Sequence, residues 1–249
     1  MGKGSRLVDR WHRSGGQRRS GGQRRRGWRG TSPTASLNES LDKGEQTLLI
    51  RLDALDTQPN QVQLSGGLFR GADRGGPPSW SGSDVWPVTA SSVNGSTDSP
   101  KVAFQNSYVT AGTWVVTSVG IIDFDLGLAG APMLVPIRDA TVTMLLAGAG
   151  SGASASMGTI SGIIRTVDLV SAFAKVAGAF SDGQLCPGSP TLDGALAAFR
   201  AASDIMSDGS NGDPSKECDA ISVGIGFDAI SVQLGGVVAD PPPAVDPCN

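Results

Sequence analysis

Residues 101–119 read KVAFQNSYVTAGTWVVTSV, and this stretch decides the fold class. β-Branched and aromatic residues dominate it, which favours strands over helices. The pair Ala111-Gly112 divides it into two runs, 101–109 and 112–119, and is short enough for a hairpin turn. The stretch therefore predicts two neighbouring strands joined by a tight turn.

Strand patterns continue on both sides of this hairpin, for example in TLLIRLDAL (47–55) and in the alternating IIDFDLGL (121–128). Only two segments change to helical spacing of apolar residues, 167–179 and 190–206. We therefore predict a mainly β fold, a β-sandwich of jelly-roll-like type, with two short helices as an insert at about 167–206.

The first 30 residues differ sharply from the rest. They hold ten of the 20 Lys and Arg but one acid, Asp9, whereas the remainder carries ten bases against 22 acids. The unit RSGGQR occurs twice, starting at Arg13. The segment is either an arm that neutralises phosphates or a misassigned start that replaces the native N-terminus. Both interpretations predict disorder over 1–35, because little apolar surface can be buried there.

A single folded domain is expected over 36–249. Its first residues, S-L-N-E from Ser36, have the spacing of a capping box, which predicts a helix that starts at Ser36 and ends near Lys43. About 200 residues are enough to bury a core without metal or disulfide support.

The chemistry that the folded part could perform is limited by its lack of histidine. The only histidine, His12, lies in the Arg-rich segment, so a Ser-His-Asp triad, a Cys-His pair and a His-based metal site are excluded from 36–249. We therefore predict no enzyme activity and no cofactor. Carboxylate-only chemistry on polysaccharides stays open, with Asp123 and Asp125 on one face of a strand, although a solvent-facing strand edge would show the same pattern.

Exposed aromatic residues beside carboxylates could stack on sugar rings. The alternative is that these large side chains fill the core or fasten the long loop to the sheet. The candidate ligand-binding residues are Trp80, Asp84, Trp86, Tyr108 and Trp114.

An acidic, Gly-containing stretch at 204–217 is the one candidate metal site. Asp208, Asn211 and Asp213 could hold Ca²⁺, but no phase of the stretch has EF-hand spacing. A solvated loop of Asx turns is the alternative.

The three cysteines bear on location. Cys186 and Cys218 flank the second predicted helix and its acidic loop, and a disulfide between them would contribute roughly 3 kcal/mol by the chain-entropy model. Cys248 is then left without a partner, which a missing N-terminal segment could supply. The alternative is three reduced thiols in a cytosolic protein.

Several segments carry a resemblance: DGALAAFRAASDIMSDG, then CDAISVGIGFDAISVQLG and the final DPC, with LLIRLDALD and GSDVW earlier. Over roughly 37–249 the chain resembles uncharacterised secreted or lipid-anchored β-rich proteins of high-GC bacteria. The resemblance implies an extracytoplasmic place, at the outer surface or in the periplasm, provided that the native N-terminus with its signal peptide is missing. Otherwise no location is predicted. No transmembrane helix is expected, because the most apolar stretch, LVSAFAKVAGAF, is short and contains Lys175.

These observations predict a non-catalytic protein of the cell envelope or extracellular space, with a structural or ligand-binding role. The expected partner is a cell-surface glycan or another envelope protein. One alternative is a carbohydrate-binding or carboxylate-only polysaccharide-active protein. The second is nucleic-acid binding through the Arg-rich arm, which would make binding strongly salt-dependent.

Overall fold

The computed structural model is mainly β, as the sequence predicts. It describes residues 5–12, 33–117, 119–127, 132–148, 150–181, 183–211, 213–243, 245 and 248. Within these ranges the strands are β1 (Ser5–His12), β2 (Thr47–Asp53), β3 (Gln61–Gly71), β4 (Val85–Thr89), β5 (Val102–Thr110), β6 (Thr113–Val116), β7 (Ile122–Asp125), β8 (Leu134–Ala147), β9 (Ser154–Arg165), β10 (Ala220–Ser231) and β11 (Gln233–Val238). The helices are α1 (Pro33–Lys43), α2 (Thr166–Phe180) and α3 (Pro190–Ala201), with 3₁₀ turns η1 (Ala90–Ser92) and η2 (Gly150–Gly152).

The predicted hairpin is confirmed. Strands β5 and β6 pair antiparallel, with Thr110 opposite Thr113. The φ angles of Ala111 and Gly112 are 48° and 78°, which places both residues in the left-handed region that a type I′ turn requires. Glycine adopts this conformation without steric cost, so the turn sequence suits the turn geometry.

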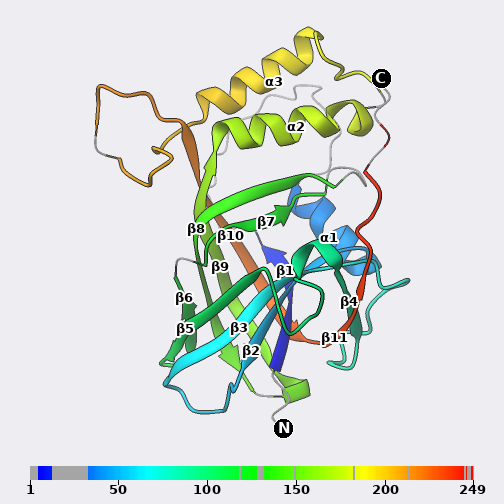
Figure 1. The fold of residues 1–249 in the computed structure, drawn as a ribbon, viewed down its shortest axis with the longest axis vertical. Helices are drawn as coiled ribbons and strands as arrows, with labels where there is room; N and C mark the ends of the chain where they lie inside the picture. The colour runs from blue at the N-terminus through cyan, green and yellow to red at the C-terminus, as the bar shows by residue number, and fades with distance from the viewer. Residues whose placement is uncertain are drawn as a thin grey trace, which may run out of the picture.

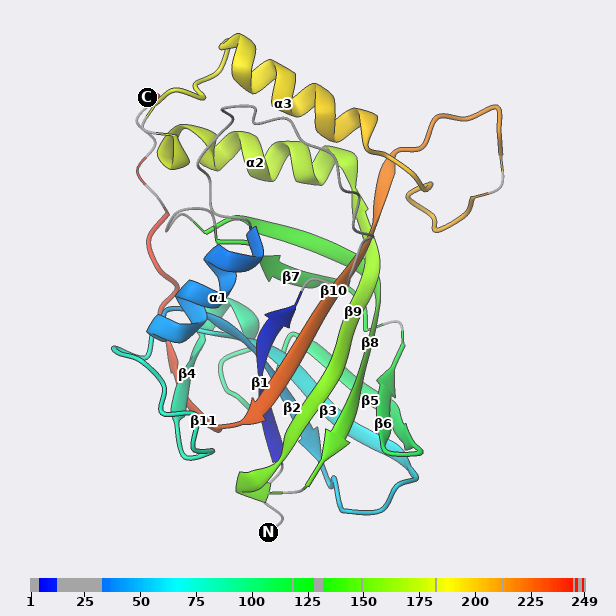
Figure 2. The same ribbon diagram turned by 180° about the vertical axis from the view of Figure 1, so that it is seen from behind.

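Eight strands form a closed circuit of pairings. Strands β3, β2, β1, β10, β9, β8, β6 and β5 follow one another, each antiparallel to the next, and β5 also pairs with β3. Figures 1 and 2 show the curved sheet from its two sides. Strand β7 pairs with β8 outside this circuit, and β11 lies parallel to β4.

The opposite walls of the circuit share one apolar core, which gives the fold its sandwich-like character. Trp114, Met144, Ile160 and Phe227, from four different strands, are each at most 1% exposed and belong to the same cluster. Alternation along each strand directs such residues inward. Consecutive strands of the circuit pair with each other, so the order is up-and-down, whereas a jelly roll would need Greek-key connections.

The two predicted C-terminal helices are confirmed as α2 and α3, which lie across one end of the sheet (Figure 1). Phe173 of α2 packs edge-on against Phe199 of α3, with ring centroids 5.1 Å apart. Val176 and Ala177 join the main core. Among the helices of the described ranges, none has both the length and the apolar composition needed to cross a membrane.

The N-terminal segment differs from the expectation in part. The structure pairs the backbone of Ser5–His12 with β10 on one side and β2 on the other. Backbone hydrogen bonds do not depend on composition, which explains why an Arg-rich segment can complete a sheet. Residues 13–32 lie outside the described ones, so the expected disorder there stays a prediction.

Helix α1 is present where a short helix was predicted, but the capping box is wrong. The helix begins at Pro33, three residues before Ser36. The Ser36 hydroxyl instead donates to the carbonyl oxygen of Gly127 at 3.0 Å. The side chain thus links α1 to the loop after β7, a contact that local spacing cannot reveal.

The predicted disulfide between Cys186 and Cys218 is wrong in its pairing. Cys186 is bonded to Cys248, with Cα atoms 5.4 Å apart, and Cys218 is a half-buried free thiol. The C-terminal segment returns along the side of the sheet to the turn between α2 and α3, whereas the loop before Cys218 extends away from the helices (Figure 1). The pairing follows this chain path, which the spacing of the cysteines does not encode.

Candidate functional site

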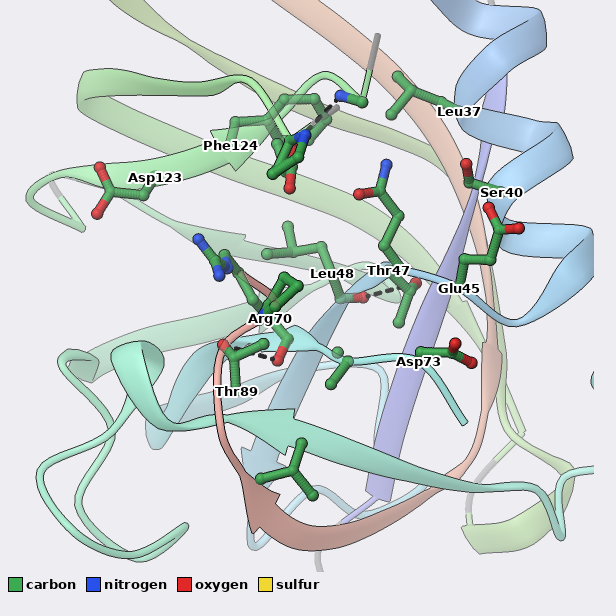
Figure 3. A pocket seen from close by; sticks show the side chains of 18 of the residues that line it. Leu37, Ser40, Glu45, Thr47, Leu48, Arg70, Asp73, Thr89, Asp123 and Phe124 are labelled. Atoms are coloured by element: carbon green, nitrogen blue, oxygen red, sulfur yellow. Dashed lines mark hydrogen bonds between the residues drawn. The ribbon is translucent and has the colours of Figure 1, made fainter. Parts of the chain in front are cut away.

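A cavity of about 600 Å³ lies between α1, the ends of β2 and β3, β7 and the segment after β11 (Figure 3). This volume is within the usual range for small-molecule sites. Its lining residues are Leu37, Ser40, Glu45, Gln46, Thr47, Leu48, Arg70, Gly71, Ala72, Asp73, Thr89, Asp123, Phe124, Asp125, Gly127, Pro132, Val238, Ala239, Pro241 and Pro242.

The apolar part of the cavity is continuous with the main core. Leu48 faces the same side of β2 as Ile50 and Leu52, and all three belong to that core. Leu37 of α1 and Phe124 of β7 join it from the two sides of the cavity. The floor therefore forms where the inward-facing rows of the strands reach their last residues.

Asp125 is the half-buried carboxylate of the cavity wall. Its Oδ1 accepts hydrogen bonds from the backbone N–H groups of Gly127 and Met133, both at 3.0 Å. Burial raises the pKa of Asp125, although these two bonds and the charge of Arg70 act in the opposite direction. Asp123, two residues earlier on β7, also lines the cavity and is exposed.

Arg70 joins the cavity wall to the C-terminal segment. Its Nη2 lies 2.8 Å from Oδ1 of Asp240. The other oxygen of Asp240 accepts from the backbone N–H of Ser91 at 2.9 Å, and the Ser91 hydroxyl also donates to this carboxylate. Asp240 is therefore held by β3 and η1 together, which fixes one wall of the cavity.

Gln46 is the unusual polar group of the lining. Its Nε2 is buried and has no hydrogen-bond partner among the residues that the structure describes. It lies so close to Gly127 that a Cβ at that position would be 2.3 Å away, so the Gln46 side chain packs directly against this glycine. A buried amide without an acceptor is unfavourable, and rotation of the Gln46 side chain into the cavity would give it an acceptor on a ligand.

Two residues of this cavity, Asp123 and Asp125, were candidates for carboxylate chemistry in the sequence, because they share one face of a strand. The sequence patterns missed Gln46, Arg70 and the apolar floor. These residues come from segments far apart in the sequence, and none belongs to a local motif that could have marked it.

The predicted aromatic ligand site is not formed, because its members serve the core or fasten the loop. Trp86 is fully buried, and its Nε1 donates to the carbonyl oxygen of Ala72 at 2.8 Å. Trp80 lies beside it, with ring centroids 6.4 Å apart. Trp114 is on the opposite side of β2 and β3 in the main core, where its ring lies 5.4 Å from that of Phe104.

The two remaining members of that set, Tyr108 and Asp84, belong to different segments, β5 and the loop before β4. Tyr108 is 40% exposed on β5. Asp84 is buried, and it accepts from the backbone N–H groups of Ser79 and Trp80 at 2.9 and 2.8 Å. Arg74 Nη2 is 3.1 Å from the same carboxylate. Asp84 therefore organises the long loop and is not presented to a sugar.

The candidate calcium residues lie in an exposed loop and bond to their neighbours. Asp208 accepts from the Ser210 backbone N–H at 2.9 Å, and Asp213 accepts from that of Ser215 at 3.0 Å. Asn211 is exposed between them. In the part of the chain that the structure describes, no group of three or more His, Cys, Asp or Glu is arranged to hold a metal ion.

Comparison of the chain with family models, with curated proteins and with solved structures gave no match. The class of protein is therefore defined by its own geometry. It is a mainly β protein whose closed circuit of strands carries a mixed polar and apolar cavity at one end.

Proposed function

We propose that this protein is a non-catalytic binding protein that acts outside the cytoplasm and holds a small molecule in the cavity beside α1. The observation that carries the proposal is the cavity itself, which combines an apolar floor, formed by Leu37, Leu48 and Phe124, with convergent polar groups. Such a combination is typical of small-molecule sites, where apolar contacts supply affinity and a few polar groups fix orientation.

The test is to fill the cavity without removing a binding group. Ser40 is a half-buried lining residue on α1, so Ser40→Trp is expected to occupy part of the volume. Ligands found by ligand-observed NMR against the wild-type protein should no longer bind this variant. Asp42→Trp, an exposed position on the same helix that does not line the cavity, is the matched control. Equal binding by both variants would refute this site.

The extracytoplasmic location draws its support from the Cys186–Cys248 bond, because disulfides persist mainly in oxidising compartments. Intact mass of the protein from its native host, with and without reductant, is the test. Alkylation is expected to label one thiol, Cys218, before reduction and all three cysteines afterwards. Three labelled thiols before reduction would contradict the location.

A second candidate function is carboxylate-only hydrolysis of a polysaccharide. Two observations favour it: Asp123 and Asp125 both line the cavity, and burial raises the pKa of Asp125, as a general acid requires. Release of reducing ends from cell-surface polysaccharide, lost in Asp125→Asn, would replace the binding proposal with this one. Nucleic-acid binding through the Arg-rich arm, residues 1–30, remains a prediction. Deletion of its residues 13–30, which keeps β1, together with a salt titration tests it.

A further inference from the structure

The charges around the cavity are unbalanced. Four of its lining side chains are acids, Glu45, Asp73, Asp123 and Asp125, against one base, Arg70. Close grouping of one sign of charge beside low-dielectric walls concentrates the potential and attracts the opposite charge. The excess of acids therefore favours a positively charged occupant over a negatively charged one.

Arg70, the one base of the lining, already has an ion-pair partner. Arg70 forms its ion pair with Asp240, which lies in the segment after β11 and is also bonded to Ser91. Consequently the guanidinium is held at the C-terminal segment, and its charge acts on Asp125 only from a distance, without an ion pair. In the described part of the chain, Asp125 has no ion pair with Lys or Arg within 4 Å, and its partners are the two backbone N–H groups.

Asp125 is also the most buried of the four acids. Burial of a carboxylate without a cation costs desolvation free energy, and the attraction of a bound cation would offset part of it. The neighbouring floor, formed by Leu37, Leu48 and Phe124, offers apolar contact for the body of the same molecule. The cavity volume far exceeds that of a single ion, which favours an organic cation over a metal ion.

The buried amide of Gln46 adds a second, independent requirement. Its Nε2 donor lacks an acceptor within the described structure, although it lies in the wall beside Gly127. Rotation of the Gln46 side chain into the cavity would let a hydroxyl or carbonyl oxygen on the ligand accept from this group. The occupant would then carry a cationic group and an oxygen acceptor at separate positions.

We propose that the cavity binds a small organic cation with a hydroxyl or carbonyl group, the ammonium seated at Asp125 and Asp123 and the oxygen at Gln46. This inference rests on the proposed binding function and specifies the class of ligand.

Three probes of equal length separate the charge from the rest of the molecule: 6-aminohexan-1-ol, hexane-1,6-diol and 6-hydroxyhexanoate. All carry the same hydroxyl and six carbons, of which the last is the carboxylate carbon in the anion, and they differ in charge at the other end. Titration followed by NMR at low ionic strength should show the amine binding at least about tenfold more tightly than the diol, with the anion weakest. At about 1 M salt, where charges are screened within about 3 Å, this preference should shrink.

Two variants identify the carboxylates responsible. Asp125→Asn keeps an oxygen that can accept from Gly127 and Met133, so it preserves the turn, and it should lower amine affinity about tenfold while leaving the diol unchanged. Asp123 is exposed, so Asp123→Asn removes a second negative charge of the cavity with little effect on folding. Asp56→Asn, an exposed acid that does not line the cavity, controls for net charge and should bind like the wild type.

The possible failures are distinguishable. If the diol or the anion binds as tightly as the amine, or if neither cavity variant changes the preference, the cationic ligand class is wrong while the binding function stands. If none of the three probes binds the wild-type protein, the cationic ligand class is wrong, and the ligand screen with Ser40→Trp decides the binding function separately. Binding of the amine that Ser40→Trp leaves intact would place the site elsewhere and overturn the inference.

Discussion

The interior of the closed circuit of strands is filled by side chains, whereas the end of the sheet beside α1 contains an open cavity. Inside the circuit, Trp114 meets Phe104 and other apolar side chains that leave it fully buried. At the cavity end the sheet stops, and α1, β7 and the C-terminal segment provide the walls. Strands whose inward rows face each other fill their interior, whereas three segments of unrelated geometry leave space and bring acids to it. The comparison predicts that the circuit supplies stability and the cavity end supplies binding.

Trp114→Ala should have the largest effect, because it removes the bulkiest side chain of the circuit core. We expect a loss of about 4 kcal/mol in the free energy of unfolding, measured by urea denaturation. Tyr108→Ala, on the same hairpin but 40% exposed, should cost less than about 1 kcal/mol. Similar losses for the two variants would contradict the prediction that the buried core of the circuit supplies the stability.

Cys248→Ser tests how firmly the C-terminal wall is fastened. Loss of the bond to Cys186 should cost roughly 3 kcal/mol, because the unfolded chain regains the freedom of a long loop. Cys218→Ser, which removes the free thiol, should change stability by no more than about 0.5 kcal/mol. Urea denaturation is again the measurement, and a larger loss in Cys218→Ser than in Cys248→Ser would favour the Cys186–Cys218 pairing instead.

Asp84→Asn tests a buried carboxylate that has both backbone N–H donors and an arginine as partners. Burial alone would raise the pKa of Asp84, but hydrogen bonds from Ser79 and Trp80 and the charge of Arg74 lower it overall. We expect a loss of about 2 kcal/mol at neutral pH, because the uncharged amide accepts less strongly and leaves Arg74 without its partner.

The pH dependence of the Asp84 variant follows from the direction of the shift. A lowered pKa in the folded state contributes stability above the ordinary value of 3.8, and this contribution is lost as the pH falls through the folded-state pKa. The difference between wild type and Asp84→Asn should therefore narrow in acid. A gap that stays constant from neutral pH to about pH 2 would show that the charge of Asp84 is not what stabilises the loop.

Asp125→Asn should have the smallest effect on stability, and of the opposite sign. A raised folded-state pKa means that folding favours the protonated carboxyl, so the contribution is present below 3.8 and lost as the pH rises through the raised pKa. The variant should thus be as stable as the wild type in acid and slightly more stable at neutral pH, by less than about 1 kcal/mol. Thermal unfolding across this pH range is the measurement, and destabilisation at neutral pH would show a structural role for the charge.

Local sequence patterns were enough to predict the β5–β6 hairpin and the two C-terminal helices. The Ala111-Gly112 turn predicted the β5–β6 hairpin, and helical spacing of apolar residues predicted α2 and α3. Both signals act between residues close in sequence. The start of α1 was misplaced because Ser36 bonds to Gly127, a partner that is 91 residues away.

The candidate site was predicted less well, because residue type does not determine the direction in which a side chain points. Trp86 and Asp84 have the composition of a sugar site, yet their partners are Ala72 and Ser79 of the same loop region. Only Asp123 and Asp125 were placed correctly together, since their spacing on one strand is itself a local property.

By itself, the sequence determined that the chain is mainly β, where its principal hairpin turns, that two helices follow near the C-terminal part, and that 36–249 contains no histidine. Only the tertiary structure decided that β5 meets β3 to close the circuit, that Cys186 pairs with Cys248, and that Gln46, Arg70 and Asp125 line one cavity. The physical reason is the separation in sequence between the residues that interact. Turn conformation and side-chain alternation are fixed within a few residues, whereas pairing, burial and the balance of charge around a cavity depend on which distant segments meet.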